Sequence, residues 1–492
     1  FDIVLPEGVS PDDYARRDAT GAVMRVSSRR GPSVRLESGD ERLLKALEPS
    51  WSGYGRLLAA HPAFRFVVPY SERRDGAEPS WGGDAVRYRA ETGREMPKDI
   101  PGRTMGWAEA RRRYPDGVVP EDDPILAYYR WFWRDGDGWP RYVGAAARAF
   151  RKGAAGKGDF TTFWDPGVRC PPRWGSGGTV DMLNQWIYAN PEPMAAAGAA
   201  EEVLAMTAGR IGQKAMIHTQ LMCYRRQVAP ENVTPANLPP WMGTFRDATF
   251  LAIPPDVLTE ACWSMFAKPM HGYGFYPFNC VQNSGSYWYP YSCPELGGRM
   301  RGILKDVLAP LGPTLLKLGR ATPDVAVFES FTSVVMGAPF AMGWNAPPVT
   351  FLQRARLDPQ VVYEETILRD RLDGVKVVFA PNCRYLTPTL IAKLREFQAR
   401  GGILVGDGEL LKSLKADVTV STVRFAAPPK EDQVAGIEES DPGGNPMLSQ
   451  ARRDTRQAKL SMVANAERLR QALKGRYEAR SDSSSADIVV YN

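Results

Sequence analysis

The alternation of short apolar runs with longer helical stretches, from residue 1 to about residue 320, most constrains what this chain can fold into. Such alternation is typical of α/β layering, in which helices connect parallel strands. The runs that we expect to form strands lie at 1–6, 64–70, 160–165, 180–188, 214–224 and 272–278. The stretches that we expect to form helices include 124–134, 140–152, 194–209, 255–267 and 298–318.

Several of the strand-like runs end in an aromatic or polar residue that is followed by a long loop rich in Gly and Pro. This arrangement is typical of a (β/α)8 barrel, or TIM barrel, whose active site is built at the carboxyl ends of its strands. The expected strands are fewer than eight, so we expect the first strands of the barrel to be missing. The sequence opens on "FDIVLP" without an initiator Met and closes on "ADIVVYN", and we interpret it as an internal piece of a longer protein.

A second α/β pattern begins near residue 323. The strand-like runs "DVAVFES", "VKVVFAP" and "GGILVGD" recur there, and the helical stretch "TPTLIAKLREFQARGG" precedes the last of them. This pattern predicts a small, open, doubly wound sheet of flavodoxin-like layout. The expected organisation is a barrel at 1–320, a doubly wound α/β domain at 321–426 and a linker or loop at 427–450. A helix and strand at 451–492 would either complete the α/β domain or lead into a further domain that is missing here.

The composition excludes several classes of protein. A chain of 492 residues is too long for one compact core, which agrees with two or more domains. The net charge of +6 is scattered, without the basic stripe of a nucleic-acid binder, and no apolar run is long enough to span a membrane. The Cys and His residues lack metal-ligand spacing, and "GDGE" at 406–409 lacks the spacing of a nucleotide-binding loop. We therefore expect no metal, cofactor, nucleic-acid partner or membrane span.

One carboxylate stands at a position suited to acid catalysis. Glu72 follows the strand-like run "FRFVVPY" in the segment "SERRDG", with Tyr70 and Arg73 beside it. A carboxylate at the end of a strand can be tuned as a proton donor. Cleavage of a glycosidic bond needs such a donor together with a second carboxylate. A solvated charge cluster just past a strand is the alternative interpretation of Glu72.

The second carboxylate is less well defined. Asp165 ends the run "FTTFWD" directly before Pro166, and Asp181 begins the run "VDMLNQWIY". Both residue types are also common in turns and at strand starts, so a structural role remains open for each. The run at 214–224 ends in Gln220 and Tyr224 without a carboxylate. Asp165 and then Asp181 are our candidates for the catalytic partner of Glu72.

Aromatic residues gather at the ends of the strand-like runs and in the loops after them. Aromatic faces above a cleft are surfaces on which sugar rings stack. The alternative is that these side chains are large and merely half-buried. With the polar residues near them, the expected substrate-binding residues are Tyr70, Arg73, Trp164, Trp186, Tyr188, Gln220 and Tyr224.

Four segments together give the chain a resemblance to β-galactosidase-like glycoside hydrolases of the family-42 type. They are "VVPYSERRD", "WIYANPEP", "PPDVLTEACWSMFAKPMHGYGFYPF" and "VKVVFAPNCRYLTPTLIAKLREFQARGGILVGD". The resemblance implies a TIM barrel joined to a trimerisation domain that is similar to class I glutamine amidotransferases, followed by a small β-sandwich. It implies a homo-oligomer such as a trimer, with "FDIVLP" as the third barrel strand and "ADIVVYN" as the first strand of the sandwich.

By position, Glu72 matches the acid/base of this family, although Ser71 precedes it where the family has Asn. The family's nucleophile is a Glu at the end of the seventh strand, where this chain has Thr219 and Gln220. The resemblance therefore implies a glycosidase of oligo- or polysaccharides, as a β-galactosidase-like exo-enzyme. The departures at these positions keep open a divergent or inactive barrel that binds carbohydrate or acts as a scaffold.

A further alternative places amidotransferase or peptidase chemistry in the second domain, with Cys383 as nucleophile. A nucleophilic Cys needs a His base, and it stands on a sharp turn with small neighbours. Cys383 lies in "PNCRY" without a glycine beside it, and no His follows His271 in the chain. This alternative is therefore the weakest of the three, and we expect the second domain to serve assembly.

Overall fold

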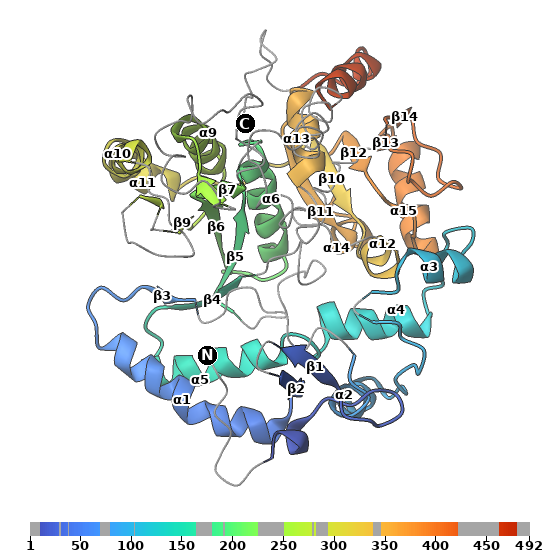
Figure 1. Ribbon diagram of the computed structural model, residues 1–492. Coiled ribbons are helices and arrows are strands. Elements are labelled where there is room, and N and C mark those ends of the chain that lie inside the picture. The colour runs from blue at the N-terminus through green and yellow to red at the C-terminus, as the bar shows by residue number, and fades with distance from the viewer. Residues whose placement is uncertain are drawn as a thin grey trace, which may run out of the picture.

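The computed structural model describes residues 10–28, 31–37, 39–68, 79–102, 104–163, 180–189, 192–224, 250–277, 280–281, 294–337, 346–421 and 462–479. Two five-stranded parallel sheets organise these residues. Figure 1 shows the strands of the first sheet mostly in green and those of the second in orange, with N-terminal helices in blue and cyan beneath them. Among the helices in these ranges, none is long and apolar enough to cross a bilayer.

The first sheet is an open parallel half-barrel. Its strand order is β3 (Phe66–Val67), β4 (Asp159–Phe163), β5 (Met182–Ile187), β6 (Lys214–Gln220) and β9 (Gly272–Tyr276). Every neighbouring pair is parallel. Strands are therefore confirmed in the runs expected at 64–70, 160–165, 180–188, 214–224 and 272–278, whereas the run at 1–6 lies outside the described residues.

The run at 214–224 is not one strand, as the sequence suggested, but two. After β6 the chain turns away at Leu221, whose N–H bonds to the carbonyl of Tyr276 and whose carbonyl accepts from Ile253 at 2.9 Å. The remaining residues form β7 (Met222–Tyr224), which pairs antiparallel with β8 (Phe250–Ala252). The N–H of Leu221 thus makes the last bond of the ladder between β6 and β9, and its carbonyl bonds to the segment after β8.

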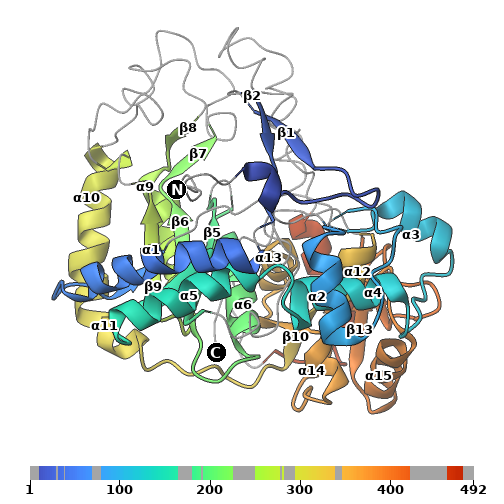
Figure 2. The same ribbon diagram turned by 90° about the horizontal axis from the view of Figure 1, so that it is seen from below.

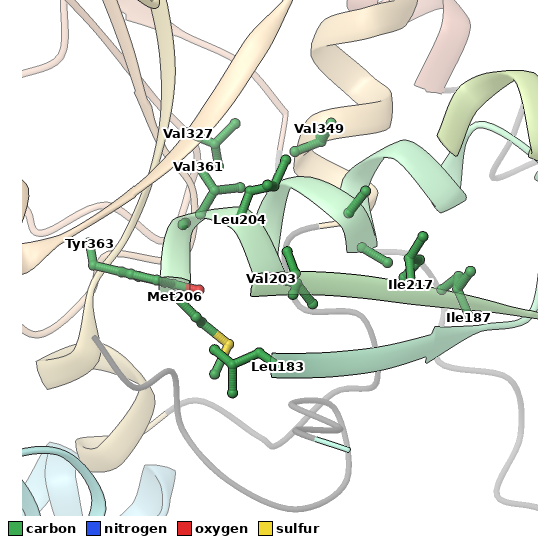
Figure 3. Close-up of a cluster of buried hydrophobic side chains, with 14 of the residues drawn as sticks. Leu183, Ile187, Val203, Leu204, Met206, Ile217, Val327, Val349, Val361 and Tyr363 are labelled. Carbon is green, nitrogen blue, oxygen red and sulfur yellow. The ribbon is translucent and has the colours of Figure 1, made fainter. Parts of the chain in front are cut away.

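Alternate residues of β5 and β6 face opposite sides of the half-barrel. Leu183 and Ile187 of β5 and Ile217 of β6 pack against α6 (Ala195–Thr207), as Figure 3 shows. The residues between them, including Asn184 and His218, face the other side, because successive side chains of a strand alternate. We call this opposite side the inner face of the half-barrel.

The second sheet has the order β11 (Pro359–Tyr363), β10 (Val325–Glu329), β12 (Val377–Ala380), β13 (Ile403–Gly406) and β14 (Val418–Thr419), all parallel. In chain order this is 2-1-3-4-5, the flavodoxin-like order that the sequence predicted. Helix α15 (Pro388–Ala399) is also confirmed, whereas β11 and β14 were not foreseen.

Both faces of the second sheet are buried. Val325 and Val327 of β10 belong to the core shared with α6 and α13 (Ala346–Arg354). The intervening residue Ala326 packs with α14 (Glu364–Leu368) and α15 in a separate core. A strand that is buried on both faces has apolar residues at successive positions. This is why the sequence "DVAVFES" predicted a strand.

The remaining helices confirm the expected helical stretches and add an N-terminal layer. The helices of the predicted stretches are α4 (Pro124–Tyr129) with η2 (Arg130–Asp135), α5 (Arg141–Ala154), α9 (Pro255–Phe266), and α10 (Pro294–Gly302), η5 (Ile303–Leu308) and α11 (Ala309–Leu315). The other described elements are η1 (Pro11–Tyr14), β1 (Arg25–Ser28), β2 (Gly31–Val34), α1 (Glu41–Ala59), α2 (Gly83–Thr92), α3 (Trp107–Arg113), α12 (Phe331–Met336) and a helix at 462–473.

Two glycines allow α1 and α5 to pack backbone against backbone. Figure 2 shows the two helices lying side by side. A β-carbon at Gly55 of α1 would overlap the carbonyl oxygen of Phe150 in α5, and one at Gly153 of α5 would overlap that of Ser52. Larger residues at either position would force the helices apart.

We expect Gly55→Ala to lower the free energy of unfolding by about 1–3 kcal/mol, because the added methyl group overpacks a backbone contact. Gly53→Ala is the matched control in the same helix, since its β-carbon would have only the end of the Arg56 side chain within 4 Å. That control should stabilise the protein by about 0.5–1 kcal/mol, the helix-propensity difference between Gly and Ala. Denaturant unfolding measures both, and equal effects of the two substitutions would contradict the close crossing.

Candidate functional site

The residues predicted from the sequence to form the site fall into two groups. Glu72, Asp165, Tyr70, Arg73 and Trp164 lie outside the described residues. The structure describes the side chains of Asp181, Trp186, Tyr188 and Gln220. Of Tyr224 it describes the backbone alone.

Asp181 lies at the amino end of β5, directly before the strand begins. Its carboxylate accepts hydrogen bonds from Arg151 of α5 at 3.0 and 2.8 Å and from the N–H of Phe160 in β4 at 2.9 Å. A strand of this length separates Asp181 from the carboxyl end of β5 by about 20 Å. The structure therefore does not bring Asp181 to the edge where a (β/α) barrel does its chemistry, and the contacts indicate a structural role.

The inner face carries two adjacent rows of side chains near the carboxyl ends of the strands. In one row Trp186 of β5 pairs with His218 of β6, and His218 pairs with Gly274 of β9. In the next row Gln220 pairs with Tyr276. Residues paired in parallel strands share a face, so the predicted binding residues Trp186 and Gln220 are brought onto one surface.

The aromatic part of this surface is formed by Trp186 and Tyr188. Their rings meet edge to face, with centroids 5.3 Å apart and an interplanar angle of 85°. Trp186 is buried at 7% exposure, and Tyr188 is half-buried. This edge-to-face arrangement fixes the orientation of both rings, as a stacking platform requires.

His218 is a site residue that the sequence analysis did not single out. Its Nδ1 lies 2.7 Å from Oδ1 of Asn184, which is fully buried on β5. A β-carbon at Gly274 would overlap the His218 ring, so only glycine leaves room for it. Burial lowers the pKa of His218 to about 4, and the imidazole is therefore neutral near pH 7. His218 stands two residues before Gln220 on the same strand, and residues two apart on a strand face the same side. This spacing was the signal that could have identified His218 from the sequence.

Carboxylates are scarce at this edge among the described residues. The final residues of β5, β6 and β9 in the described ranges are Ile187, Gln220 and Tyr276, none of which is acidic. The next carboxylate after β5 is Glu192, whose two oxygens accept from Nη2 of Arg354 at 3.0 and 3.1 Å. Glu192 thus joins the loop after β5 to α13, and the catalytic carboxylates remain Glu72 and Asp165 as predictions.

A cavity of about 670 Å³ lies at the opposite, amino edge of the half-barrel. Phe66, Met182 and Met216 contribute apolar lining, and the Lys214–Asp159 ion pair of 2.6 Å contributes charge. Within the described ranges, no group of three or more His, Cys, Asp or Glu side chains is placed to hold a metal ion.

The second sheet has a closed carboxyl edge. In flavodoxin-like sheets a ligand binds where the strand order reverses, here between the ends of β10 and β12. Ser333, from the helix after β10, donates its hydroxyl to the carbonyl of Tyr385 at 2.6 Å and accepts from the N–H of Tyr385 at 3.0 Å. The chain segment at Gly117 and Val119 then pairs with Leu386 through hydrogen bonds of 3.1 and 3.0 Å.

Cys383 lies within this closed edge. It is 1% exposed, and its thiol points to the carbonyl oxygens of Phe328 and Pro381 at 3.8 and 3.5 Å. Burial raises the pKa of the Cys383 thiol well above its ordinary value, which disfavours the reactive thiolate. The geometry therefore opposes a nucleophilic role for Cys383.

No protein-family model matches this sequence, and a comparison with curated proteins finds no match either. Solved structures do match. A GH42 β-galactosidase from G. stearothermophilus aligns with a TM-score of 0.51 at 10% identity, covering 80% of this chain and 58% of the other. A catalytic mutant of that enzyme gives a TM-score of 0.50 at 11% identity with the same coverage. A β-galactosidase from Marinomonas ef1 gives a TM-score of 0.48 at 12% identity, covering 86% of this chain and 66% of the other.

The alignments with the G. stearothermophilus enzyme confirm the resemblance to family-42 glycoside hydrolases at the level of fold. The chain spans about three fifths of the length of the solved structures that it matches. At identities of 10–12% the likeness shows the fold alone.

We expect the neutral state of His218 to make stability pH-dependent. Because the pKa is about 4 in the folded protein and ordinarily 6.5, the unfolded chain binds this proton first as the pH falls. The free energy of unfolding should therefore decrease between pH 6.5 and 4, by up to about 3 kcal/mol from this residue. Denaturant unfolding at pH 7 and pH 4.5 should show a smaller loss for His218→Gln than for the unsubstituted protein.

The exposed His61 provides the control for this measurement. His61→Gln should leave the pH dependence of stability as it is. If His218→Gln and the unsubstituted protein lost equal stability on acidification, His218 would not be neutral in the folded state.

Proposed function

We propose that this protein is a glycoside hydrolase that acts on an oligo- or polysaccharide as a β-galactosidase-like exo-enzyme. The observation that carries this proposal is the inner face of the half-barrel, where Trp186 and Gln220 converge in a fold similar to that of family-42 β-galactosidases. Trp186, Tyr188, His218 and Gln220, the described residues of this surface, are aromatic or polar and uncharged near neutral pH, which suits the C–H faces and hydroxyls of a neutral sugar.

In this proposal Glu72 is the general acid. It follows the end of β3 by five residues, and the carboxyl ends of parallel strands share one edge of the sheet. Protonation of the leaving oxygen by Glu72 would allow the glycosidic bond to break. We also propose that the other residues predicted from the sequence bind the substrate. They are Tyr70, Arg73, Trp164, Tyr188 and Tyr224.

Asp165 is the preferred partner of Glu72. It follows Phe163, the last residue of β4, by two positions, and Phe163 pairs with Asn184 of the inner face. A carboxylate separation of about 5–5.5 Å would give retention of configuration, and about 6.5–9.5 Å would give inversion. The sequence suggested Asp181 as the other possible partner of Glu72. We do not retain it, because its side-chain contacts lie at the amino edge of the half-barrel.

Assembly through the second sheet completes the proposal. The carboxyl edge of that sheet is closed by Ser333, Tyr385 and Leu386, which leaves its outer surfaces for contacts between protomers. We propose a homo-oligomer, with a trimer as the form that the resemblance implies.

A second candidate function is carbohydrate binding without hydrolysis. The observation that favours it is Gln220, an amide at the end of the strand where the resemblance implies a nucleophilic Glu. A barrel of this kind would bind sugars on the same inner face and would show no turnover of any glycoside.

We expect Glu72→Gln to lower hydrolysis of glycosides with poor leaving groups by about 10²–10⁴-fold, the usual contribution of general acid catalysis. Glycosides with activated aryl leaving groups should be affected far less, because they depart without a proton. The measurement is the rate on a panel of 4-nitrophenyl and alkyl glycosides with the full chain.

Asp181→Asn serves as the control, since it removes a carboxylate of the half-barrel at the structural edge. It should lower thermal stability and leave the rate per folded molecule within about twofold. Equal loss of activity in both variants would refute the assignment of Glu72, and sugar binding without hydrolysis would favour the second candidate function.

We expect Cys383→Ser to keep full hydrolytic activity, because the thiol is buried away from the inner face and is held in its neutral form. A modest loss of stability is expected from placing a hydroxyl where a weakly bonded thiol lay. Abolition of activity with an unchanged melting temperature would show that the second sheet takes part in the chemistry.

A further inference from the structure

A cavity of about 470 Å³ lies between the helix at 462–473 and the end of α13. Figure 1 shows this helix in red, next to α13. Leu357, two residues before β11, lines the cavity, and so does Tyr477, whose hydroxyl donates to Oδ2 of Asp324 directly before β10 at 2.8 Å. The cavity therefore lies at the amino edge of the second sheet and shares no residue with the inner face or with the closed carboxyl edge. Its volume falls within the range of small-molecule sites, about 300–1,000 Å³.

The charged side chains that line this cavity are mostly cationic. Arg356 follows α13, Arg470 lies in the last turn of the helix at 462–473, and Lys474 comes directly after that helix. Glu478 is the acidic residue of the lining, so the three cations leave a net charge of +2 near neutral pH. Holding like charges around one cavity costs free energy, and a bound anion would offset that cost.

The ends of the two helices account for part of this charge, because cations are favourable at a helix C-terminus. Arg356 ends α13 with a φ of 62°, and Gly475 follows the other helix with a φ of 76°. A helix end needs its cation near its own last carbonyl groups, however, and does not need a cavity that it shares with the cations of another helix. The experiment below separates these two roles.

An apolar wall lies beside the cations. Leu357 is 4% exposed and Leu473 is 2% exposed, and Tyr477 is half-buried next to them. Guanidinium groups bind carboxylate and phosphate oxygens in a bidentate manner, and an ammonium group adds a compact positive charge. The apolar wall suits a carbon skeleton, which an inorganic anion lacks.

We propose that this cavity binds a small organic dianion, a phosphate monoester or a dicarboxylate. Its charged groups lie between the three cations, and its carbon skeleton lies against the apolar wall. The inference goes beyond the proposed function and does not depend on it, because the cavity lies in another part of the fold.

The position of the cavity gives the ligand an effect on stability. A dianion held by Arg356 and Arg470 joins α13 to the helix at 462–473. Asp358, the residue after Leu357, already pairs with Lys268 at 3.2 Å and so connects this region to the half-barrel. A ligand that binds only the folded chain raises its melting temperature in proportion to ligand concentration over Kd.

The experiment measures thermal unfolding and calorimetric binding on the full chain with glycerol 3-phosphate, phenyl phosphate, succinate and malate. Inorganic phosphate and sulfate serve as bare anions, and glycerol serves as the neutral counterpart. None of these probes is a sugar, and constant ionic strength keeps general screening equal. At least one organic dianion should raise the melting temperature and bind about tenfold or more tightly than glycerol and inorganic phosphate.

Substitutions of opposite sign locate the site. Arg356→Gln should weaken the best dianion by about tenfold, because it removes a half-buried charge-assisted hydrogen bond. Lys474→Gln should weaken it by about two- to fivefold, since this side chain is exposed. Glu478→Gln should instead tighten binding by about two- to fivefold, because it removes a negative charge from the lining. A folding defect cannot produce tighter binding.

Arg468 provides the matched control. It lies in the same helix, is exposed, donates to Oδ1 of Asn465 at 3.2 Å and does not line this cavity. Arg468→Gln should therefore leave the affinity for the dianion unchanged.

Three results would overturn the inference. If no organic dianion binds more tightly than glycerol, the cations serve only the helix ends. If Arg468→Gln and Arg356→Gln weaken binding equally, the dianion binds to the general positive charge of the surface. If inorganic phosphate or sulfate binds as tightly as every organic dianion, the apolar wall takes no part and the ligand class is wrong.

Discussion

The burial of helix α6 between the two parallel sheets is the constraint on which the rest of the structure depends. Residues 196–206 of this helix are all buried, so it has no solvent face. Figure 3 shows Val203 and Met206 directed toward Leu183 of the first sheet, and Leu204 directed toward Val327 and Val361 of the second. A helix that is surrounded by core must be apolar or small on every side, and the Ala- and Gly-rich start of α6 meets that requirement.

Two glutamates interrupt the apolar surface of α6, and each must be neutralised or hydrogen-bonded. Glu201 is 2% exposed and pairs with Lys268 at 3.0 Å and Arg320 at 2.8 Å. Although burial alone would raise the pKa of Glu201, these two cations hold it below its ordinary value. Lys268 also reaches Asp358, directly before β11, at 3.2 Å. The ion-pair network thus fixes the second sheet against the half-barrel, and no part of it can be removed without leaving a buried charge.

Much of this fold was predictable because local patterns determine it. The apolar runs of β10 and β12 are uniform, because strands with two buried faces consist of successive hydrophobic residues, and the helical stretches of α6 and α15 are long. β11 was not foreseen, because "PQVVY" begins with Pro359 and carries the half-exposed Gln360 on its open edge. The end of β6 at Gln220 could not be predicted from the sequence either, because the carbonyl of Leu221 accepts a hydrogen bond from Ile253, a residue distant in the sequence.

The candidate site was predictable in its residue types more than in its geometry. Trp186 and Gln220 were expected on a binding face, and the register of β5, β6 and β9 brings them together. Asp181 stands before its apolar run in the sequence, and this order already placed it at the amino end of a strand. Asn184 could not be selected, because its contact with His218 depends on how two strands separated by a helix are aligned.

The neutral inner face also bears on which carboxylate chemistry the half-barrel can support. A carboxylic acid beside Trp186, His218 and Gln220 would be desolvated. None of these three side chains is a cation near neutral pH, so none would favour the charged form of the acid. Desolvation raises the pKa of a carboxyl group, and a general acid must still hold its proton near neutral pH. The Lys214–Asp159 ion pair of the same sheet lies at the amino edge and is already neutralised. Around Trp186, His218 and Gln220 the described residues thus form a neutral, hydrogen-bonding surface, which is the environment that a proton donor such as Glu72 would require.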